Sequence, residues 1–144
     1  MFDMVKDVKM TKVNNAAAAG TTDQDSDRVD MTGYDSVCFV WSIGDVTSGS
    51  VLQAIAKSNA ADSTSSSTTE KSGTSITAGA SDYDNKMLIV NVHRPTLRYA
   101  YSSLVIDTQN AVVNGCYAFQ YNAKVVPVTQ GSTVGDAVTG GPNA

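Results

Sequence analysis

Alternation of apolar and small or polar residues is the feature that most constrains the fold of this chain. From Ser36 to Ile43 every second residue is large and apolar, namely Val37, Phe39, Trp41 and Ile43. A β-strand sends successive side chains to opposite faces of its sheet, so this pattern is typical of a strand with one buried face. We therefore predict a strand here whose odd-numbered side chains enter the core.

Two further segments alternate in the same way. Between Cys116 and Val125 we expect the odd-numbered set to point inward, which comprises Tyr117, Phe119, Tyr121, Ala123 and Val125. Between Lys86 and His93 one side carries Leu88, Val90 and Val92, while the other side carries Met87 and Ile89. Apolar residues on both sides predict a strand that is covered on both faces or lies near a subunit contact.

Less regular segments complete the pattern. Leu97, Tyr99 and Tyr101 share one parity and the next large residues share the other, so a β-bulge is expected near Ser102 and Ser103. Residues 5–13 alternate poorly and fit either an edge strand or an extended arm. Residues 51–58 fit a short helix or a strand, and the preceding glycine and the Ser/Thr-rich sequel favour the strand.

The fold class follows from these strands and from the length of the chain. With 144 residues the chain has the size of one domain. We predict an all-β protein: a single antiparallel β-sandwich or barrel-like domain over residues 29–130, with an extended N-terminal arm and a flexible C-terminal tail. Residues 1–28 are assigned to the arm or edge strand and an acidic loop.

Two segments are poor in large apolar side chains. Residues 59–80 are mostly Ser, Thr, Ala, Gly and Asp, and residues 131–144 are rich in glycine. Ordering a backbone costs about 1–2 kcal/mol per residue, which such side chains do not offset. We expect a flexible Ser/Thr-rich loop at 59–80 and a flexible tail at 131–144.

Charge and hydropathy argue against two classes of partner. The formal net charge is −4 and the basic residues are dispersed, so the electrostatic attraction on which nucleic-acid binding depends is missing. No apolar run approaches the roughly 20 residues that a membrane-spanning helix needs, and the N-terminus lacks the features of a signal peptide. We expect a soluble protein made in the cytosol, with no nucleic-acid and no membrane partner.

Residues able to perform catalysis are few. A Ser-His-Asp triad would have to use His93, the single histidine, and neither a nucleophile elbow nor a phosphate-binding loop motif occurs. The two cysteines, Cys38 and Cys116, lie within apolar segments and are interpreted as reduced core or near-core residues. The chain is therefore predicted not to be an enzyme and to need no cofactor.

An acidic cluster offers the best candidate for a metal site. Asp23, Asp25 and Asp27 match positions 1, 3 and 5 of a calcium-binding loop. Arg28 stands where that loop needs glycine, and Tyr34 stands where it needs a bidentate glutamate. A solvated acidic loop is the favoured interpretation, so no metal site is predicted.

Basic and aromatic residues could also mark a binding surface. Arg94, Arg98, Lys86 and Lys124 could share a sheet face and meet an acidic partner, although ordinary solvated positions are favoured. The aromatic residues follow strand parity, so we predict that they pack in the core and do not form a stacking platform for sugars or bases.

Several segments carry a resemblance to a known group. These are Val29–Tyr34, the Gly44–Gly49 turn, Arg98–Tyr99, Asn110–Gly115, Ala118–Tyr121 and Pro127–Gln130. They resemble small structural proteins of tailed bacteriophages and prophages, over roughly Val29 to Gln130. The resemblance implies a virion component without catalytic residues, most plausibly a capsid decoration (cement) protein. Such a protein is made in the bacterial host cytoplasm and binds the major capsid protein on the capsid exterior.

An adhesive role of this kind would depend on surface burial. We expect a small cyclic homo-oligomer, a trimer first, with the arm at residues 1–15 as the leading contact. The candidate interface residues are Phe2, Met4, Val5, Val8, Met10, Met87, Ile89, Arg94 and Arg98. Two alternatives remain open: a head-tail connector or tail structural component, and an independent module that binds a sugar or calcium.

Overall fold

The computed structural model describes residues 1–63 and 66–140, and nearly all of its regular structure is β. The elements, in chain order, are α1 (Met4–Asp7), β1 (Lys9–Asn14), β2 (Ala17–Gly20), β3 (Gln24–Asp25), β4 (Val29–Asp30), β5 (Tyr34–Val46), β6 (Val51–Asn59), β7 (Ser67–Ser72), β8 (Ile76–Thr77), β9 (Met87–His93), β10 (Tyr99–Asp107) and β11 (Ala111–Ala123).

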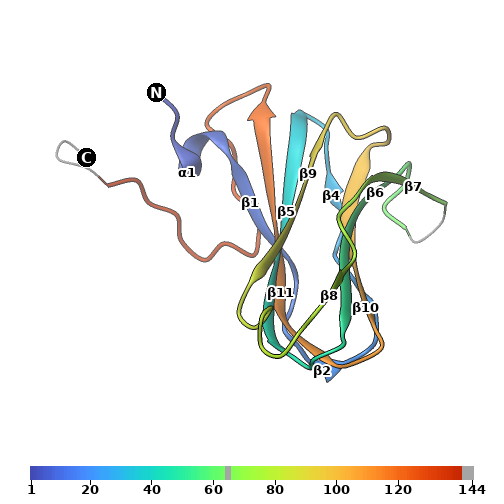
Figure 1. Cartoon of the computed structure of the whole chain (residues 1–144). Coiled ribbons are helices and arrows are strands. Elements are labelled where there is room, and N and C mark those ends of the chain that lie inside the picture. Colours follow the sequence, from blue (N-terminus) through green and yellow to red (C-terminus); the bar gives the residue numbers. More distant parts are fainter. Residues whose placement is uncertain (64–65, 141–144) are drawn as a thin grey trace.

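These strands form two antiparallel sheets that pack face to face (Figure 1). The front sheet has the order β1-β11-β5-β9. β2 pairs with the N-terminal part of β11, beyond the part that pairs with β1. The back sheet has the order β3-β10-β6-β7, while β4 pairs with β10 and β8 pairs with β6. The predicted all-β sandwich is confirmed, and the sheets do not close into a barrel.

The centre of the core lies on β5, as the alternation predicts. Val37, Phe39, Trp41 and Ile43 are all buried against the back sheet. The indole Nε1–H of Trp41 donates a hydrogen bond of 2.9 Å to the hydroxyl of Ser102 on β10. Because buried polar groups need partners, this bond fixes the ring and joins the two sheets at their middle.

The prediction for β11 had the wrong parity. The inward side chains are Cys116, Ala118 and Gln120, so Tyr117, Phe119 and Tyr121 point outward. The register explains the reversal: Cys116 lies directly opposite Trp41 on β5, and Ala118 lies directly opposite Phe39. Next to such large rings the close-packed interior admits only small side chains from the neighbouring strand.

β10 follows the same logic and contains no bulge. It pairs with β6 in an unbroken register from Tyr99 to Asp107, and its inward set is Ala100, Ser102, Leu104 and Ile106. The small residues face the Trp41 ring, which occupies the space that a large side chain would need. Tyr101 lies on the outer side, where the Arg28 guanidinium stacks 4.4 Å from its ring centre. The strand expected at residues 51–58 is confirmed as β6.

The Asn114-Gly115 dipeptide, a pair of residues common in tight turns, lies inside β11 as an irregularity. Gly115 has a φ of +142°, and an added Cβ would come within 2.9 Å of the carbonyl oxygen of Asn14. Glycine is therefore needed because β1 approaches the bulged strand closely.

The loop expected at residues 59–80 is in part a sheet edge. β7 and β8 lie within it and pair with β6, although residues 64–65 lie outside the described part of the chain. The Glu70 carboxylate accepts hydrogen bonds from the Ser58 hydroxyl and from the Thr96 backbone. A strand can pair with the backbone of an existing strand without large apolar side chains of its own. Composition alone therefore could not distinguish this sheet edge from a loop.

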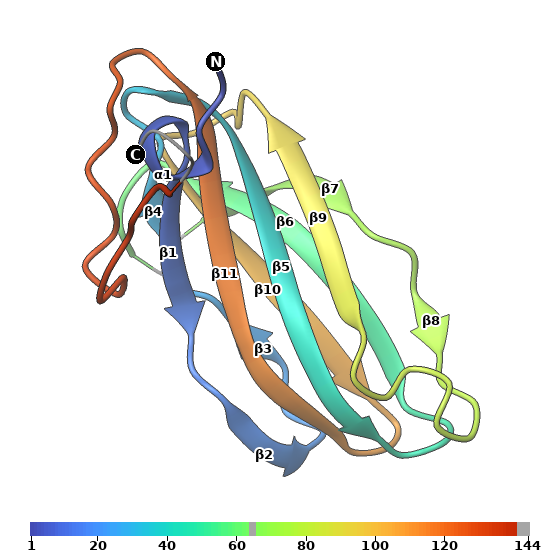
Figure 2. The same cartoon turned by 90° about the vertical axis from the view of Figure 1, so that its left-hand side faces the viewer.

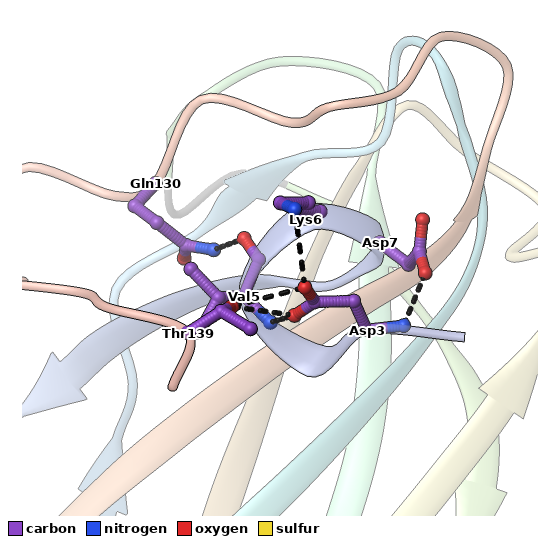
Figure 3. A network of polar contacts seen from close by, with 6 residues as sticks. All are labelled: Asp3, Val5, Lys6, Asp7, Gln130 and Thr139. Carbon is purple, nitrogen blue, oxygen red and sulfur yellow. Dashed lines mark hydrogen bonds and ion pairs between the residues drawn. The ribbon is translucent and has the colours of Figure 1, made fainter. Parts of the chain in front are cut away.

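The N-terminal segment is also built into the sandwich and is not an extended arm. α1 begins after Asp3, whose side chain accepts a hydrogen bond from the Val5 amide, and β1 then pairs with β11 as an edge strand. The expected flexible tail runs back past this segment, and the Thr139 hydroxyl donates to the Asp3 carboxylate (Figure 3). Residues 141–144 of that tail lie outside the described residues.

Gln130 attaches the tail to β1 and α1. Its Nε2 donates to the carbonyl oxygens of Val5 and Val8 at 2.7 and 2.8 Å, and its Oε1 accepts from the Met10 amide at 2.8 Å. Figure 3 shows the contact with Val5. We call this set of three bonds the Gln130 latch, and it closes the β1 edge of the front sheet.

Candidate protein-interaction surface

The outward side of the front sheet, here called the front face, displays a band of apolar and aromatic side chains. β-pairing places them in register across four strands. The members are Met10 and Lys12 on β1, Tyr117, Phe119 and Tyr121 on β11, Cys38 and Val40 on β5, and Met87, Ile89, Asn91 and His93 on β9. No other segment of the described chain covers β5 or β9 on this side (Figure 2).

Exposure on the front face is greatest toward β9. Met87 and Ile89 retain 61% and 59% of their accessible surface, and Tyr117 retains 38%. Val40 lies between Tyr117 and Ile89 in one row across the sheet and is half-buried. Contiguous exposed apolar side chains of this kind mark protein-interaction sites more often than isolated ones do.

A hollow of about 250 Å³ opens at the β1 side of the front face. It is lined by Met10, Thr11, Lys12, Tyr117, Phe119, Thr133 and Val134. The tail residues form one wall and the aromatic rings of β11 form the other. The front face therefore combines a concave apolar region near β1 with a protruding apolar edge at β9.

The predicted interface residues divide into separate places. Phe2 and Met4 are 67% and 48% exposed beside α1, while Met87 and Ile89 lie at the opposite edge of the front sheet. Val5 is half-buried, and Met10 belongs to the front face. Val8 is only 3% exposed, because the N-terminal segment packs into the sandwich, so its side chain is covered within the chain itself.

The two predicted arginines line a hollow of about 370 Å³ at one end of the sandwich, here called the end hollow. The Nε of Arg94 lies 3.2 Å from the Asp35 carboxylate, and the Arg94 side chain is 84% exposed. Arg98 forms a two-pronged contact with Asp30, through Nε at 3.0 Å and Nη2 at 2.7 Å. Each arginine is thus neutralised by its own aspartate, so the end hollow is not a basic site.

The Arg98–Asp30 pair also shifts the titration of both groups. Hydrogen bonding from the Arg98 guanidinium holds the pKa of Asp30 well below its usual range, and the same contact raises the pKa of Arg98. Both side chains are partly exposed, which limits the contribution of the pair to stability.

The wider basic patch considered from the sequence does not form. The Lys124 amide donates to the Gly33 carbonyl oxygen beside the end hollow. Lys86 precedes β9 at the other end of the sandwich, where its ammonium lies 5.3 Å from the Tyr83 ring centre. A strand of seven residues separates Lys86 from Arg94.

The acidic cluster is engaged in holding strands. The Asp23 carboxylate accepts a hydrogen bond from the Ile106 amide, and the Asp25 carboxylate accepts one from the Ser103 hydroxyl. These contacts fix β3 against β10. Among residues 1–63 and 66–140, no group of three or more His, Cys, Asp or Glu side chains is placed to hold a metal ion. Asp27 therefore joins no such group there.

His93 forms a pair with a serine, but in an arrangement unsuited to nucleophilic catalysis. Its Nδ1 lies 2.8 Å from the Ser36 hydroxyl, and its ring meets that of Tyr121 edge-on at 6.0 Å. Its Nε2 faces the Asn91 amide at 3.4 Å, so no carboxylate of the described residues orients the ring. Ser36 is completely buried, which keeps a substrate away from its hydroxyl.

The cysteines are free thiols in different surroundings. Cys116 is buried in the core and burial raises its pKa, while Cys38 is half-buried on the front face and its pKa is also raised by burial. Raised thiol pKa values reduce the thiolate fraction and hence the reactivity of both groups.

The aromatic part of the front face was missed from the sequence because alternation assigns the large aromatic side chains of β11 to the core, whereas its small and polar side chains are the inward ones. The only signal was the small size of Cys116 and Ala118, which gains meaning once Trp41 and Phe39 are known to lie opposite.

No helix in the described part of the chain is long and apolar enough to span a membrane. No protein-family model matches the sequence, and a search of curated proteins finds no significant match.

Proposed function

We propose that this chain is a structural virion protein of a tailed bacteriophage, one that binds the exterior of the assembled capsid and bridges major capsid protein subunits. The front face carries this proposal, because four paired strands present apolar and aromatic side chains, and over β5 and β9 no other described segment covers them. The resemblance between residues 29–130 and small phage structural proteins supplies the identity of the partner. The proposal does not involve catalysis or a cofactor.

The energy of such a contact is accounted for by a few residues. Fully burying an exposed large apolar side chain contributes about 1.5–3 kcal/mol, so Met87 and Ile89, each more than half exposed, would add about 1–2 kcal/mol apiece. Tyr117 brings both an apolar ring and a hydroxyl that can find a polar partner at the rim of a contact. A capsid repeats the docking site many times, so a small homo-oligomer can strengthen modest contacts through effective concentration.

The rigidity of the front face supports the same role. β11 and β5 are long paired strands whose inward side chains are fixed by the core around Trp41 and Phe39. A surface that is ordered before binding loses little conformational entropy on binding. By bridging neighbouring subunits in one arrangement, such a protein would stabilise the shell.

The test uses assembled heads of the virus that encodes this chain. The unmodified protein is expected to bind heads saturably, in hundreds of copies per particle, and Tyr117→Asp is expected to weaken binding by about tenfold or more. Thr69→Asp is the matched control, since Thr69 is exposed on β7 of the back sheet. Circular dichroism verifies that both variants fold.

Copy number separates this function from its main alternative. About six or twelve copies at one vertex would indicate a head-tail connector or tail component. Absence of the protein from assembled heads, or equal binding by the Tyr117→Asp and Thr69→Asp variants, would overturn the proposal.

A further inference from the structure

β9 forms an edge of the front sheet, and its outward backbone groups can be identified. The Ile43 amide donates to the Lys86 carbonyl oxygen at 2.9 Å, and the Arg94 amide donates to Asp35 at 2.7 Å. In an antiparallel ladder the backbone groups alternate in direction, so the even-numbered residues of β9 bond to β5. The amides and carbonyls of the odd-numbered residues face outward, namely those of Met87, Ile89, Asn91 and His93.

These outward groups lack partners within the described residues, whereas the opposite edge of the same sheet is closed. On β1, the Met10 amide is bound by Gln130, the Met10 carbonyl accepts from Gly131, and the Lys12 amide is bound by Thr133. The tail is hydrogen-bonded to the β1 edge, whereas in the described residues the segment between β7 and β8 only flanks β9 across a hollow shared by Gly73, Thr74 and Ile89, without a backbone bond to it.

The back sheet protects its edges by other means. β3 and β4 cover β10 on one side, and β7 on the other side is polar and carries Glu70 and Lys71. β9 has the sequence MLIVNVH, which contains no Asp, Glu, Lys, Arg, Pro or Gly. Uncovered edge strands without such residues are templates for pairing with another strand. Met87 and Ile89 add exposed apolar side chains to the same edge.

We propose that β9 pairs antiparallel with β9 of a second copy, about a two-fold axis at Ile89, and joins the two front sheets into one. A two-fold axis relates a surface to itself, so the outward donors of one strand meet the outward acceptors of the same strand in its partner. This inference depends on the edge strand alone and stands independently of capsid binding. The assembly is a dimer, in place of the trimer expected from the sequence.

The position of the axis follows from charge and from apolar contact. An axis at Val90 would place Lys86 opposite Arg94 of the second copy, and like charges directly opposite destabilise a strand pair. An axis at Asn91 would leave Met87 beyond the paired region. With the axis at Ile89, the two Ile89 side chains face each other and the two Met87 side chains flank them.

The pairing would satisfy the free backbone groups and gather Met87 and Ile89 of both copies, the most exposed apolar side chains of the front face, into one patch on that face. Residue 89 then lies opposite residue 89 of the second copy, and residue 87 lies opposite residue 91. These are hydrogen-bonded pairs, in which the two residues exchange both backbone bonds, so the two strands share about six hydrogen bonds in total. The dimer would present two front faces side by side on one continuous sheet, which doubles the surface available for a larger partner.

The first experiment is a disulfide crosslink in a Cys38→Ser background. The two residues of a hydrogen-bonded pair have Cα atoms about 5.5 Å apart, a distance that a disulfide can span. Ile89→Cys is therefore expected to give a covalent dimer under mild oxidation, on a non-reducing gel. Thr69→Cys on β7 is the matched control at another exposed strand and is expected to remain uncrosslinked.

The second experiment is sedimentation equilibrium of the full chain. Asn91→Pro removes an outward amide and leaves the bonds to β5 intact, so it is expected to weaken the dimer by about tenfold or more while the thermal transition persists. Ile89→Lys places like charges at the axis and is expected to act in the same direction. A monomeric or trimeric unmodified protein, or a dimer unaffected by both variants, would overturn the proposal. Neither result would bear on binding to heads, which the Tyr117→Asp variant tests.

Discussion

Replacing Gln130 with alanine is expected to open the β1 edge locally while the rest of the sandwich stays folded. The substitution removes all three bonds of the Gln130 latch, two donated to Val5 and Val8 and one accepted from Met10. Each intramolecular hydrogen bond contributes about 0.5–1.5 kcal/mol net, and these three are partly exposed, so the combined loss is about 2 kcal/mol. The loss concerns α1, β1 and the tail, which form the margin of the fold.

Native-state hydrogen exchange measures this opening directly, because it resolves single amides. The Met10 amide is expected to exchange roughly 30-fold faster in Gln130→Ala, since about 1.4 kcal/mol corresponds to a factor of ten. Amides of β5 and β11 at the centre of the core should keep their protection. Gln24→Ala is the control, because its side-chain amide donates a local hydrogen bond to the Thr22 carbonyl oxygen and makes no hydrogen bond to β1 within the described residues.

Unchanged exchange at Met10 in Gln130→Ala would refute this reasoning, because the latch would then not limit opening of the edge. Equal acceleration of every core amide would refute it in another way, since the tail would then belong to the global folding unit. The expected result also has a consequence for association: an opened β1 edge exposes the Met10 and Lys12 amides, so the variant should aggregate more readily than the unmodified chain.

Two further predictions concern the core and the charge pairs. Ser102→Ala leaves the Trp41 indole N–H without its buried acceptor, so the free energy of unfolding should fall by about 1–3 kcal/mol in urea denaturation. A double-mutant cycle with Trp41→Phe supplies the control, and a coupling energy near zero would contradict the assigned bond. The pKa of Asp30 is lowered in the folded state, so its ionised form stabilises the protein above the ordinary pKa, and this contribution is lost progressively as pH falls from the ordinary pKa toward the lowered one. Compared with Asp30→Asn, the unmodified protein should therefore lose its advantage in thermal stability below about pH 4; a constant difference down to pH 2 would show that Arg98 does not perturb this carboxylate.

Local alternation was sufficient to predict β5, because its two faces differ strongly in size and polarity. It failed for β11, where the large apolar side chains lie on the outward face and small or polar ones lie inward, so hydrophobicity selected the wrong face. Pairing made that choice: Trp41 and Phe39 left room only for Cys116 and Ala118 beside them, and this sent the Tyr117 and Phe119 rings outward. Much of the front face arises from this steric selection.

The candidate interface was predictable only in part. Met87 and Ile89 stood out because they broke the alternation of their own strand, and they are exposed on β9. Arg94 and Arg98 do come together at the end hollow, but the aspartates that neutralise them, Asp30 and Asp35, are distant in sequence. Charge compensation between distant segments leaves no local pattern to read.

The strand pattern by itself determined that this chain is all-β, since period-two alternation is a local property of the backbone, but it left a sandwich and a barrel-like domain open. Which sheet edges are closed and which face is apolar was decided only by the tertiary structure. Closure of the β1 edge requires Gln130 to meet residues 120 or more positions away, and the free β9 edge is recognised only by comparison with the edges that are covered. Hydrogen bonds between distant strands and competition for space around Trp41 are properties of the assembled chain, so they lie beyond any single segment.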